Sequence, residues 1–514
     1  MTRIVRFLNF AVALTRCLAQ AESSPLKPFG AIPTTRQLRW HETEFYGLIH
    51  FGINTFTDRE WGNGEESPEL FNPSAFDADQ IVGTAKDAGM HGLILVCKHH
   101  DGFCLWPSQY TEYSVKHSPW RHGKGDVVKE ISDSCRKHGL KFGVYLSPWD
   151  RNHKDYGGPD YLTYYHNQLR ELLTNYGDLF IAWFDGACGG TGYYGGARDQ
   201  RLVDNQNYYE WPGIWAQVRS LQPNAVIFSD AGPDVRWVGN ERGAADDPCW
   251  ATMDLTGCYP GMTNFKLQTA GQRSATNWVP AECDVPLRPS WFYHAGHDGR
   301  AKTLRQLINI YYSSVGYGAC LNLGLSPDKR GLIPEHDASV LRELGHIVSV
   351  TFVTNLAQYA KITASNTRGV AGDQDLLKSL FSPTNLLDGN QHTYWATDDS
   401  VTTPEVILDF GKTVTFNVVR LREYLPLGQR VDAFALDAWQ GGDWHEFAHG
   451  MSVANQRLVR TANPIITEKV RLRITQAAAC PALSEFALYL RPEPPSPFQA
   501  IATQHANDGI EVTH

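Results

Sequence analysis

Two patterns of hydrophobic and polar positions divide the chain. From residue 44 to about residue 325, short apolar runs alternate with stretches of helical period. The runs are rich in β-branched and aromatic residues, which is typical of strands buried on both faces of a sheet. They cover residues 44–52, 92–100, 142–150, 178–186, 225–230, 278–284 and 319–327.

The stretches between these runs predict amphipathic helices. In residues 77–89 the apolar side chains fall on one helical face, and Gly89 stands just after the predicted C-terminus, where glycine is favoured. Residues 126–139 repeat this arrangement and end at Gly139. Strand and helix alternating over this length predict a parallel α/β fold, of which the (β/α)8 barrel is the commonest. Seven strands are recognisable, and the pattern does not locate the eighth.

The pattern changes after about residue 352. Polar and apolar residues then alternate with a period of two, turn residues separate the runs, and helical periodicity disappears. This indicates an all-β sandwich. We therefore expect a barrel domain over residues 22–350, a sandwich over 351–492, and a flexible tail over 493–514, which is first proline-rich and then polar.

The first 21 residues have the layout of a secretory signal peptide. Arg3 and Arg6 precede a short apolar run, and Ala19-Gln20-Ala21 forms a small-residue cleavage site. We expect an exported, periplasmic or extracellular protein without membrane insertion, because no later stretch is long and apolar enough to span a bilayer. The ten cysteines show neither a disulfide framework nor a C-x-x-C metal pattern.

Composition narrows the class of ligand. The net charge is −9 and no long basic cluster is present, which argues against a nucleic-acid partner. Aromatic residues make up 12% of the chain and no nucleotide-binding motif appears. The sequence assigns no oligomeric state.

Polar or aromatic residues stand at the end of each predicted strand. In a (β/α)8 barrel these ends meet on the face that holds the active site. One such residue alone is readily a turn residue or a satisfied buried group, but seven segments together predict a pocket. They supply His50, His99, His100, Asp101, Trp149, Asp150, Asp185, Asp230, Glu282 and Asn322.

Carboxylates, imidazoles and aromatic rings in one pocket suit a sugar. Aromatic faces stack on a pyranose ring, and His and Asp side chains bind its hydroxyls. Glycoside hydrolysis needs two carboxyl groups, one as nucleophile or base and one as proton donor. Asp185, at the end of a central strand, is well placed as a nucleophile, which must stay ionised.

Several segments resemble glycoside hydrolase family 29, the α-L-fucosidases. These are HFGINTF (50–56), CKHHDGFCLWPS (97–108), YLSPWDRN (145–152), WFDGACG (183–189) and LNLGLSPDKRGLIP (321–334). The resemblance covers roughly residues 35–350. It implies hydrolysis of terminal α-L-fucosyl residues on a fucosylated oligosaccharide or glycoconjugate. It also implies a retaining mechanism through a covalent fucosyl-enzyme intermediate, without metal or cofactor.

The resemblance also implies roles for individual residues. The aspartate of WFDG, Asp185, matches the nucleophile. His50 and the pair His99-His100 match positions that bind the fucose hydroxyls. Trp106, Tyr145 and Trp183 match further pocket positions. Trp291 is expected to stack near the sugar methyl group or the neighbouring residue.

Two residues compete for the acid/base role. Glu241 in RWVGNERG resembles the acid/base of the branch that cleaves α-1,3 and α-1,4 linkages, and it is the preferred candidate. Glu282 lies at a strand end and is the alternative, or else binds a sugar hydroxyl. The purely structural interpretations are an exposed loop residue for Glu241 and a pair with Arg288 for Glu282.

Two further resemblances concern specificity. The segments GNERG and PAECDVPLRPSWFYH resemble the linkage-selective branch, which favours branched Lewis-type fucosides over simple aryl fucosides. The C-terminal part resembles a discoidin-type (coagulation factor type C) module through NLLDGNQHTYWAT and LDFGKTVTFNVVRLRE. There Trp395 is more typical of a core residue than of a ligand platform, and no clear set of calcium ligands is visible.

Three alternatives remain open at this point. A metal-dependent hydrolase would use His99, His100 and Asp101, although adjacent residues on a strand point to opposite faces and rarely bind one ion together. A catalytically inactive fucose-binding lectin would keep the barrel without the chemistry. A broad-specificity α-L-fucosidase would keep the chemistry without the linkage preference.

Overall fold

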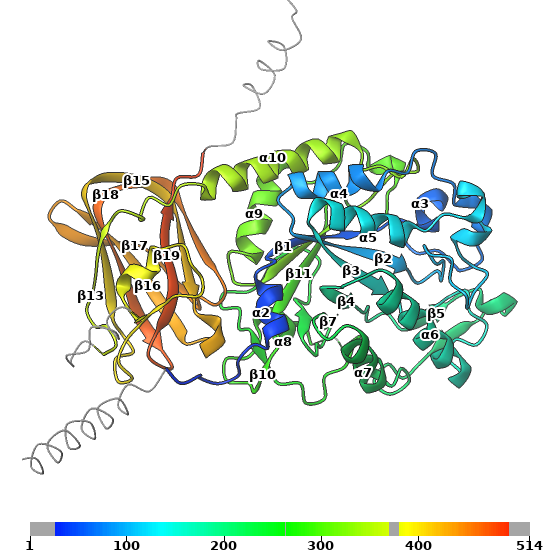
Figure 1. Cartoon of the computed structure of the whole chain (residues 1–514), viewed down its shortest axis with the longest axis horizontal. Helices are drawn as coiled ribbons and strands as arrows, with labels where there is room; N and C mark the ends of the chain where they lie inside the picture. The colour runs from blue at the N-terminus through cyan, green and yellow to red at the C-terminus, as the bar shows by residue number, and fades with distance from the viewer. Residues whose placement is uncertain (1–25, 263, 370–379, 493–514) are drawn as a thin grey trace, which may run out of the picture.

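Eight parallel strands form a closed barrel in the computed structural model, which describes residues 26–262, 264–369 and 380–492 (Figure 1). The order around the barrel is β1-β12-β11-β8-β7-β4-β3-β2. The predicted (β/α)8-type fold is confirmed. The strands are β1 Phe45–Ile49, β2 Gly92–Lys98, β3 Lys141–Leu146, β4 Ile181–Trp183, β7 Val226–Ser229, β8 Val235–Trp237, β11 Ala281–Pro286 and β12 Cys320–Leu325.

The eighth strand is β8, which the sequence pattern does not reveal. It is three residues long and follows β7 after residues 230–234, with no helix between the two strands. The prediction for 278–284 also needs correction. Residues 277–278 form β10, which pairs with β9 Thr252–Met253 outside the barrel, and the barrel strand begins at Ala281.

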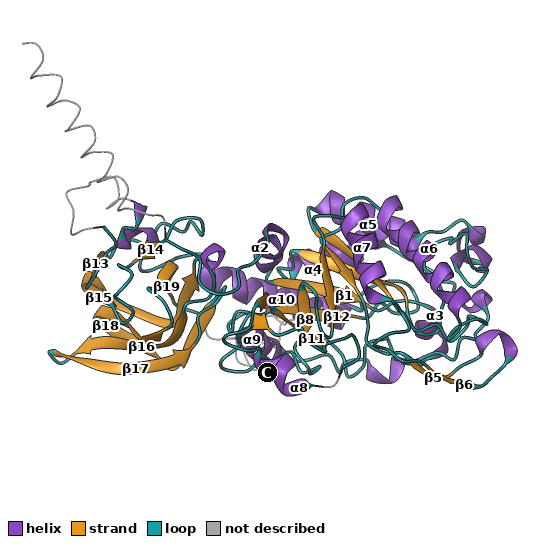
Figure 2. Cartoon of the chain, turned by 90° about the horizontal axis from the view of Figure 1, so that it is seen from below, coloured by secondary structure: helices purple, strands orange, loops and turns teal. Residues whose placement is uncertain are grey.

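Helices surround the barrel (Figure 2). Two of them begin as the sequence suggests, because Asp77 accepts a hydrogen bond from the Gln80 amide and Asp126 from the Lys129 amide. Gly139 ends the second helix with φ of 74°. The helices are α2 Thr35–His41, α3 Ile53–Thr57, α4 Ala78–Asp87, α5 Val127–His138, α6 Pro159–Asn175, α7 Trp211–Leu221, α8 Phe265–Ala270, α9 Leu304–Ser314 and α10 Glu335–Phe352.

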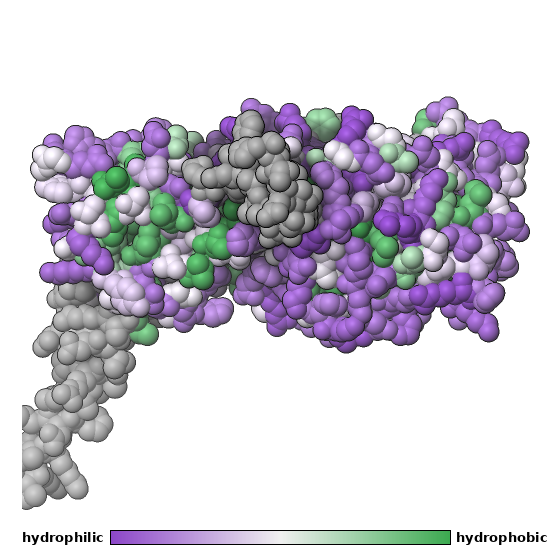
Figure 3. Space-filling view, turned by 90° about the horizontal axis from the view of Figure 1, so that it is seen from above, coloured by the Kyte–Doolittle hydropathy of each residue, from purple (hydrophilic) through white to green (hydrophobic). Residues whose placement is uncertain are grey.

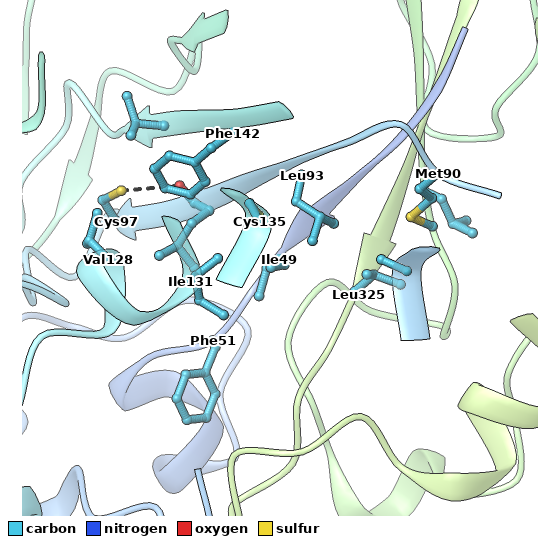
Figure 4. Packing of buried hydrophobic residues seen from close by; sticks show 14 of the residues in the cluster. Ile49, Phe51, Met90, Leu93, Cys97, Val128, Ile131, Cys135, Phe142 and Leu325 are labelled. Atoms are coloured by element: carbon cyan, nitrogen blue, oxygen red, sulfur yellow. Dashed lines mark hydrogen bonds between the residues drawn. The ribbon is translucent and has the colours of Figure 1, made fainter. Parts of the chain in front are cut away.

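The main hydrophobic core lies between the barrel strands and this layer of helices (Figure 4). Val128, Ile131 and Cys135 of α5 are fully buried beside Cys97 of β2. Burial of apolar side chains on both faces of the strands stabilises the barrel. This rigid scaffold leaves the strand ends free to present polar side chains.

An antiparallel sandwich follows the barrel, as predicted. Its two longest strands, β15 and β18, have register shifts near Asp409 and Phe416, where bulges bend a strand. Trp395 is fully buried and donates to the Asn366 carbonyl at 3.1 Å, so it is a core residue. The strands are β13 Lys361–Ala364, β14 Trp395–Ala396, β15 Glu405–Glu423, β16 Val431–Gln440, β17 Asp443–Met451, β18 Arg457–Ala477 and β19 Ala482–Tyr489.

The sandwich packs against the side of the barrel, and α10 lies along the barrel and leads to the sandwich (Figure 1). Arg457 of β18 forms an ion pair with Asp247 at 2.5 Å, and Arg422 of β15 with Glu44 at 2.8 Å. The surface seen in Figure 3 is mostly hydrophilic, and hydrophobic residues gather at its sandwich end.

The predicted signal peptide (1–21) and tail (493–514) lie outside the described residues. Within the described part, no helix has the length and apolar character needed to cross a membrane. The nine cysteines of that part are all free thiols, and seven of them are buried.

Candidate active site

A cavity of about 330 Å³ opens at the carboxyl ends of the barrel strands. It brings together nine of the residues expected from the sequence: His50, His99, His100, Tyr145, Trp183, Asp185, Asp230, Glu241 and Trp291. These residues come from seven segments that are distant in sequence. Their convergence follows from the parallel barrel, which places all strand ends on one face.

Asp185 stands two residues after the end of β4. Its Oδ1 accepts from the Ala187 amide at 2.7 Å and its Oδ2 accepts from the Tyr145 hydroxyl at 2.9 Å. A side chain at Gly186 would collide with the Asp230 carboxyl group and with the Gly261 backbone, so only glycine fits here. The Asp-Gly pair therefore aims an ionisable group into the pocket while hydrogen-bond donors support its charged form.

Three histidines line the same wall, and all are neutral. Burial lowers the pKa of His50 to about 3, and it also lowers the pKa values of His99 and His100. His100 Nδ1 hydrogen-bonds with Ser147 at 2.7 Å, which leaves Nε2 3.9 Å from Asp185 Oδ2. A neutral imidazole offers one donor and one acceptor, which suits sugar hydroxyls.

His99 and His100 both face the cavity, contrary to the alternation expected for a strand. The reason is that β2 ends at Lys98, so both residues lie beyond the strand, with ring centroids 4.1 Å apart. Among the residues that the structure describes, however, no group of three or more His, Cys, Asp or Glu side chains is arranged to hold a metal ion.

Glu241 lies on the loop after β8 and lines the cavity. Although the residue as a whole is exposed, desolvation of its carboxyl group raises the pKa of Glu241. A hydrogen-bonding interaction with the Trp291 side chain opposes this shift, and the charge of Asp185 adds to it. A carboxyl group with a raised pKa beside a carboxylate fits a proton donor.

Glu282 is placed differently from the expectation. It is completely buried in the barrel interior, where its carboxylate accepts from Trp183 Nε1 at 2.8 Å, Asn322 Nδ2 at 2.9 Å and the Tyr46 hydroxyl. Arg288 pairs instead with Asp337 and Asp298, so the predicted Glu282–Arg288 pair is wrong. Glu282 supports the floor of the pocket and does not line it.

Asp284, on the same face of β11 as Glu282, does line the cavity. Burial raises the pKa of Asp284 well above its usual value, and the adjacent Glu282 charge adds to the shift. Burial also raises the pKa of Glu282, against the hydrogen bonds that it receives. Both shifts favour the protonated form, so two negative charges on this pair are disfavoured.

Two aromatic residues that line the cavity are fixed by their contacts. Trp183 stacks between Tyr145 and Phe228, with ring centroids 4.9 Å and 4.3 Å away. The Trp291 amide donates to Glu60 Oε1 at 2.7 Å, and its ring lies 4.9 Å from that of His50. Both rings are held by several contacts, as the stacking surfaces of a sugar site need to be.

Trp106 does not belong to the pocket, which corrects the expectation. It is buried in the core, and its Nε1 donates to Glu171 Oε2 at 2.8 Å. Asp101 and Asp150 are also structural. Asp101 accepts from the Phe103 amide and from Asn54, and Asp150 forms a buried ion pair with Lys98 at 3.1 Å.

Several lining residues are missing from the sequence-based set. Their signals are weak: Asp284 stands two residues after Glu282, Phe265 begins the short helix α8, and the others lie on loops or on the short strand β8. They are Trp61, Trp237, Met262, Phe265 and Asp284.

Fold and site together define the class: a (β/α)8-type glycosidase with carboxyl groups at the strand ends. Comparison with known proteins is more specific. Residues 30–351 match the family model described as alpha-L-fucosidase, and residues 361–486 match the F5/8 type C domain. The chain belongs to the α-L-fucosidases of glycoside hydrolase family 29, which hydrolyse fucosyl residues.

Similar proteins come from several organisms. Alpha-L-fucosidase 1 of Arabidopsis thaliana is 40% identical over 95% of this chain and 94% of its own length. A family 29 member from an unknown rumen bacterium has a TM-score of 0.80 at 39% identity, covering 92% of this chain and 79% of that one. A Ruminococcus gnavus family 29 fucosidase in complex with fucose has a TM-score of 0.80 at 30% identity, covering 92% and 97%.

Proposed function

We propose that this α-L-fucosidase is a retaining exo-enzyme that removes α-1,3- or α-1,4-linked fucose from branched, Lewis-type glycans. The observation that supports it best is the pairing of two carboxyl groups with different environments in one cavity. Asp185 is held by two donors, whereas burial favours the protonated form of Glu241. Export, expected from the layout of residues 1–21, is part of the proposal.

In the first step Asp185 attacks the anomeric carbon of the fucosyl residue. The bond from that carbon to the glycosidic oxygen breaks, and Glu241 gives its proton to the departing oxygen. The product is an ester between Asp185 and fucose. The Tyr145 hydroxyl and the Ala187 amide hold the carboxylate in place before the attack.

In the second step Glu241, now ionised, takes a proton from water. The resulting hydroxide equivalent attacks the anomeric carbon, the ester bond breaks, and Asp185 returns as a carboxylate. The neutral imidazoles of His50, His99 and His100 are suited to hold the sugar hydroxyls throughout both steps. Two of their ring nitrogens, His50 Nδ1 and His99 Nδ1, have no hydrogen-bond partner among the described residues.

The linkage preference rests on Glu241 and its surroundings. The acid lies on a loop after β8, in the segment that resembles the linkage-selective branch, and not on a barrel strand. A hydrogen bond from Asn240 to the Ala244 carbonyl at 2.9 Å closes this loop, and Gly243 packs against Val285 and Ile310. A loop ordered in this way can select the leaving sugar by its shape.

The test compares fucose release from a Lewis-type trisaccharide and from a simple aryl α-L-fucoside, for wild type and Asp185→Ala. We expect wild type to prefer the trisaccharide and the variant to lose several orders of magnitude in kcat. A 2-fluoro-fucosyl fluoride should label wild type, and not Asp185→Ala, with one fluorofucosyl unit detectable by mass spectrometry.

Each alternative has its own outcome. Equal rates on both substrates would replace the linkage preference with broad specificity. Binding of fucose without any turnover would indicate a lectin. A wild-type rate that falls in chelator and returns with a divalent ion would indicate a metal-dependent hydrolase.

A further inference from the structure

The carboxyl group of Asp230, which the proposed mechanism does not use, lies beside Asp185 in the pocket. Asp185 follows Trp183 of β4 by two residues, and Asp230 follows Phe228 of β7 by two residues. Trp183 and Phe228 are paired in the parallel register of these adjacent strands. The two aspartates therefore occupy equivalent positions on neighbouring strands, which lie about 4.8 Å apart. Both line the cavity.

The position of Asp230 is fixed by its surroundings. Gln268 of α8 donates to the Asp230 carbonyl at 3.0 Å, and the Gly261 amide donates to its Oδ2 at 2.5 Å. The turn that contains Asp230 is held as well, because Asp234 accepts from the Ile227 amide at 2.8 Å. A carboxyl group held this firmly next to a reacting centre is preorganised for contact.

Other acidic groups face Asp230 from the elements around it, and no cation forms an ion pair with it among the described residues. Asp185 approaches from β4, Asp284 from β11, and the Cys188 thiol from the turn after β4. Glu241 lines the same cavity from the loop after β8. Like charges at such short range disfavour a second ionised group beside Asp185.

We propose that Asp230 is a further substrate-contacting residue, which presents a carboxylic acid, not a carboxylate, to a hydroxyl group of the bound sugar. Oδ2 accepts from the Gly261 amide, and Oδ1 forms no hydrogen bond within the described protein. Asp230 donates a hydrogen bond from its carboxylic acid to the sugar oxygen and keeps its proton, while Asp185 attacks as a carboxylate. The proposal deepens the proposed function and rests on it.

The electrostatics of the site agree with this geometry. Burial raises the pKa of Asp230 to about 7, and the charge of Asp185 contributes to the shift. The acid form is therefore the one present below about pH 7. As the pH rises through that value, Asp230 loses its proton, the donor disappears, and a second negative charge faces Asp185.

The first experiment measures kcat/KM against pH with an aryl fucoside whose leaving group is a dinitrophenol. Such a leaving group departs without a proton from Glu241, so the alkaline side of the profile reports Asp230. Wild type should lose activity as the pH rises through about 7. Asp230→Asn, whose amide keeps a donor and accepts from Gly261, should retain kcat/KM within about threefold and stay active at higher pH.

Removing the Asp230 carboxyl group should weaken the binding of fucose. Asp230→Ala is expected to weaken the calorimetric Kd for L-fucose and to lower kcat/KM, each by roughly tenfold, as for one lost hydrogen bond. Asp178→Asn serves as a matched control, because Asp178 is exposed before β4 at the opposite end of the barrel. The control should match wild type in every measurement.

Three results would overturn the inference. One is an alkaline side of the profile that is unchanged in Asp230→Asn. Another is fucose binding by Asp230→Ala within twofold of wild type. The third is a loss of kcat/KM confined to poor leaving groups, together with azide rescue of turnover on the activated aryl fucoside, which would make Asp230 the proton donor. A wild type that releases no fucose from any substrate would instead contradict the proposed function.

Discussion

Carboxyl groups in the sandwich pair with arginine side chains, whereas those in the barrel pocket do not. In the sandwich, Asp437 is bound by Arg471 and Arg473 at 2.9 and 2.7 Å, and Glu485 by Arg420 and Arg422. In the pocket, the neighbours of Asp185, Asp230, Asp284 and Glu241 are other carboxyl groups, hydroxyls, amides and neutral imidazoles. None of these four forms an ion pair with Arg or Lys within the described chain.

The consequence appears in the pKa values. Burial alone would raise the pKa of Asp437, but the hydrogen bonds from Arg473 and Arg471 outweigh it and lower the value. Burial raises the pKa values of Asp230, Asp284 and Glu241, and no guanidinium compensates. Carboxyl groups paired with arginine keep their charge and hold strands together, whereas unpaired ones remain free to exchange protons and to react.

After the loss of the nucleophile in Asp185→Ala, the largest effect should come from Glu241→Ala. A general acid contributes roughly 10²–10⁴-fold, so kcat/KM on the Lewis-type trisaccharide should fall by about 10³-fold. The loss should be small for an aryl fucoside with a good leaving group. Azide should restore turnover and yield α-L-fucosyl azide, which chromatography and NMR can identify.

Glu210→Ala is the control for this prediction, because Glu210 is an exposed loop residue outside the cavity. It should keep wild-type rates. If Glu282→Gln, and not Glu241→Ala, shows azide rescue, the acid/base role belongs to Glu282 after all. The complete burial of Glu282 leads us to expect a loss of folding stability there instead.

The sandwich side of the comparison predicts a different phenotype. Asp437→Asn leaves Arg471 and Arg473 without their shared carboxylate and should destabilise the chain by roughly 2 kcal/mol. The loss is below that of a fully buried pair because the Arg473 side chain is 32% exposed. Thermal unfolding should shift to lower temperature, while kcat of the folded enzyme stays unchanged.

The pH dependence of stability in Asp437→Asn gives a second test, because the direction of the change is fixed by the pKa shift of Asp437. The pKa of Asp437 is lowered in the folded state, so the stabilisation is present above the unfolded value near 4 and is lost as the pH falls. The difference in Tm between wild type and Asp437→Asn should therefore shrink on acidification below about pH 4. Glu468→Gln, at an exposed position of β18, should show no difference at any pH.

A smaller effect is expected for Tyr145→Phe. The variant removes the hydroxyl that donates to Asp185 Oδ2 at 2.9 Å, and a hydrogen bond to a charged group is typically worth a factor of about 10–100 in rate. The ring remains stacked on Trp183, so the fold should persist. Tyr165→Phe, whose hydroxyl donates to the Leu146 carbonyl, should lower stability and leave kcat unchanged.

Periodicity and strand-end polarity predicted the parts of the molecule that depend on local pattern. Seven barrel strands, the helices over 77–89 and 126–139, and the convergence of Asp185 with the histidines follow from them. The sequence pattern missed the eighth strand because Val235–Trp237 is too short to show a hydrophobic periodicity and no helix precedes it. The sequence pattern also missed Asp284 and Phe265, because the register of β11 and the packing of α8, which sequence spacing does not encode, bring them to the cavity.

The motif that contains Trp106 wrongly predicts that this residue lines the pocket. Its substitution is therefore expected to have the smallest effect on activity. Trp106 stands in the segment that also contains His99 and His100, yet its indole donates to Glu171 away from the cavity. Trp106→Phe should keep kcat/KM within about twofold and lower Tm slightly, since one buried hydrogen bond is lost. Trp291→Ala, inside the pocket, should lose at least tenfold in kcat/KM at little cost in Tm. A Trp106 variant with full stability and strongly reduced fucose binding would instead place that ring in contact with the sugar.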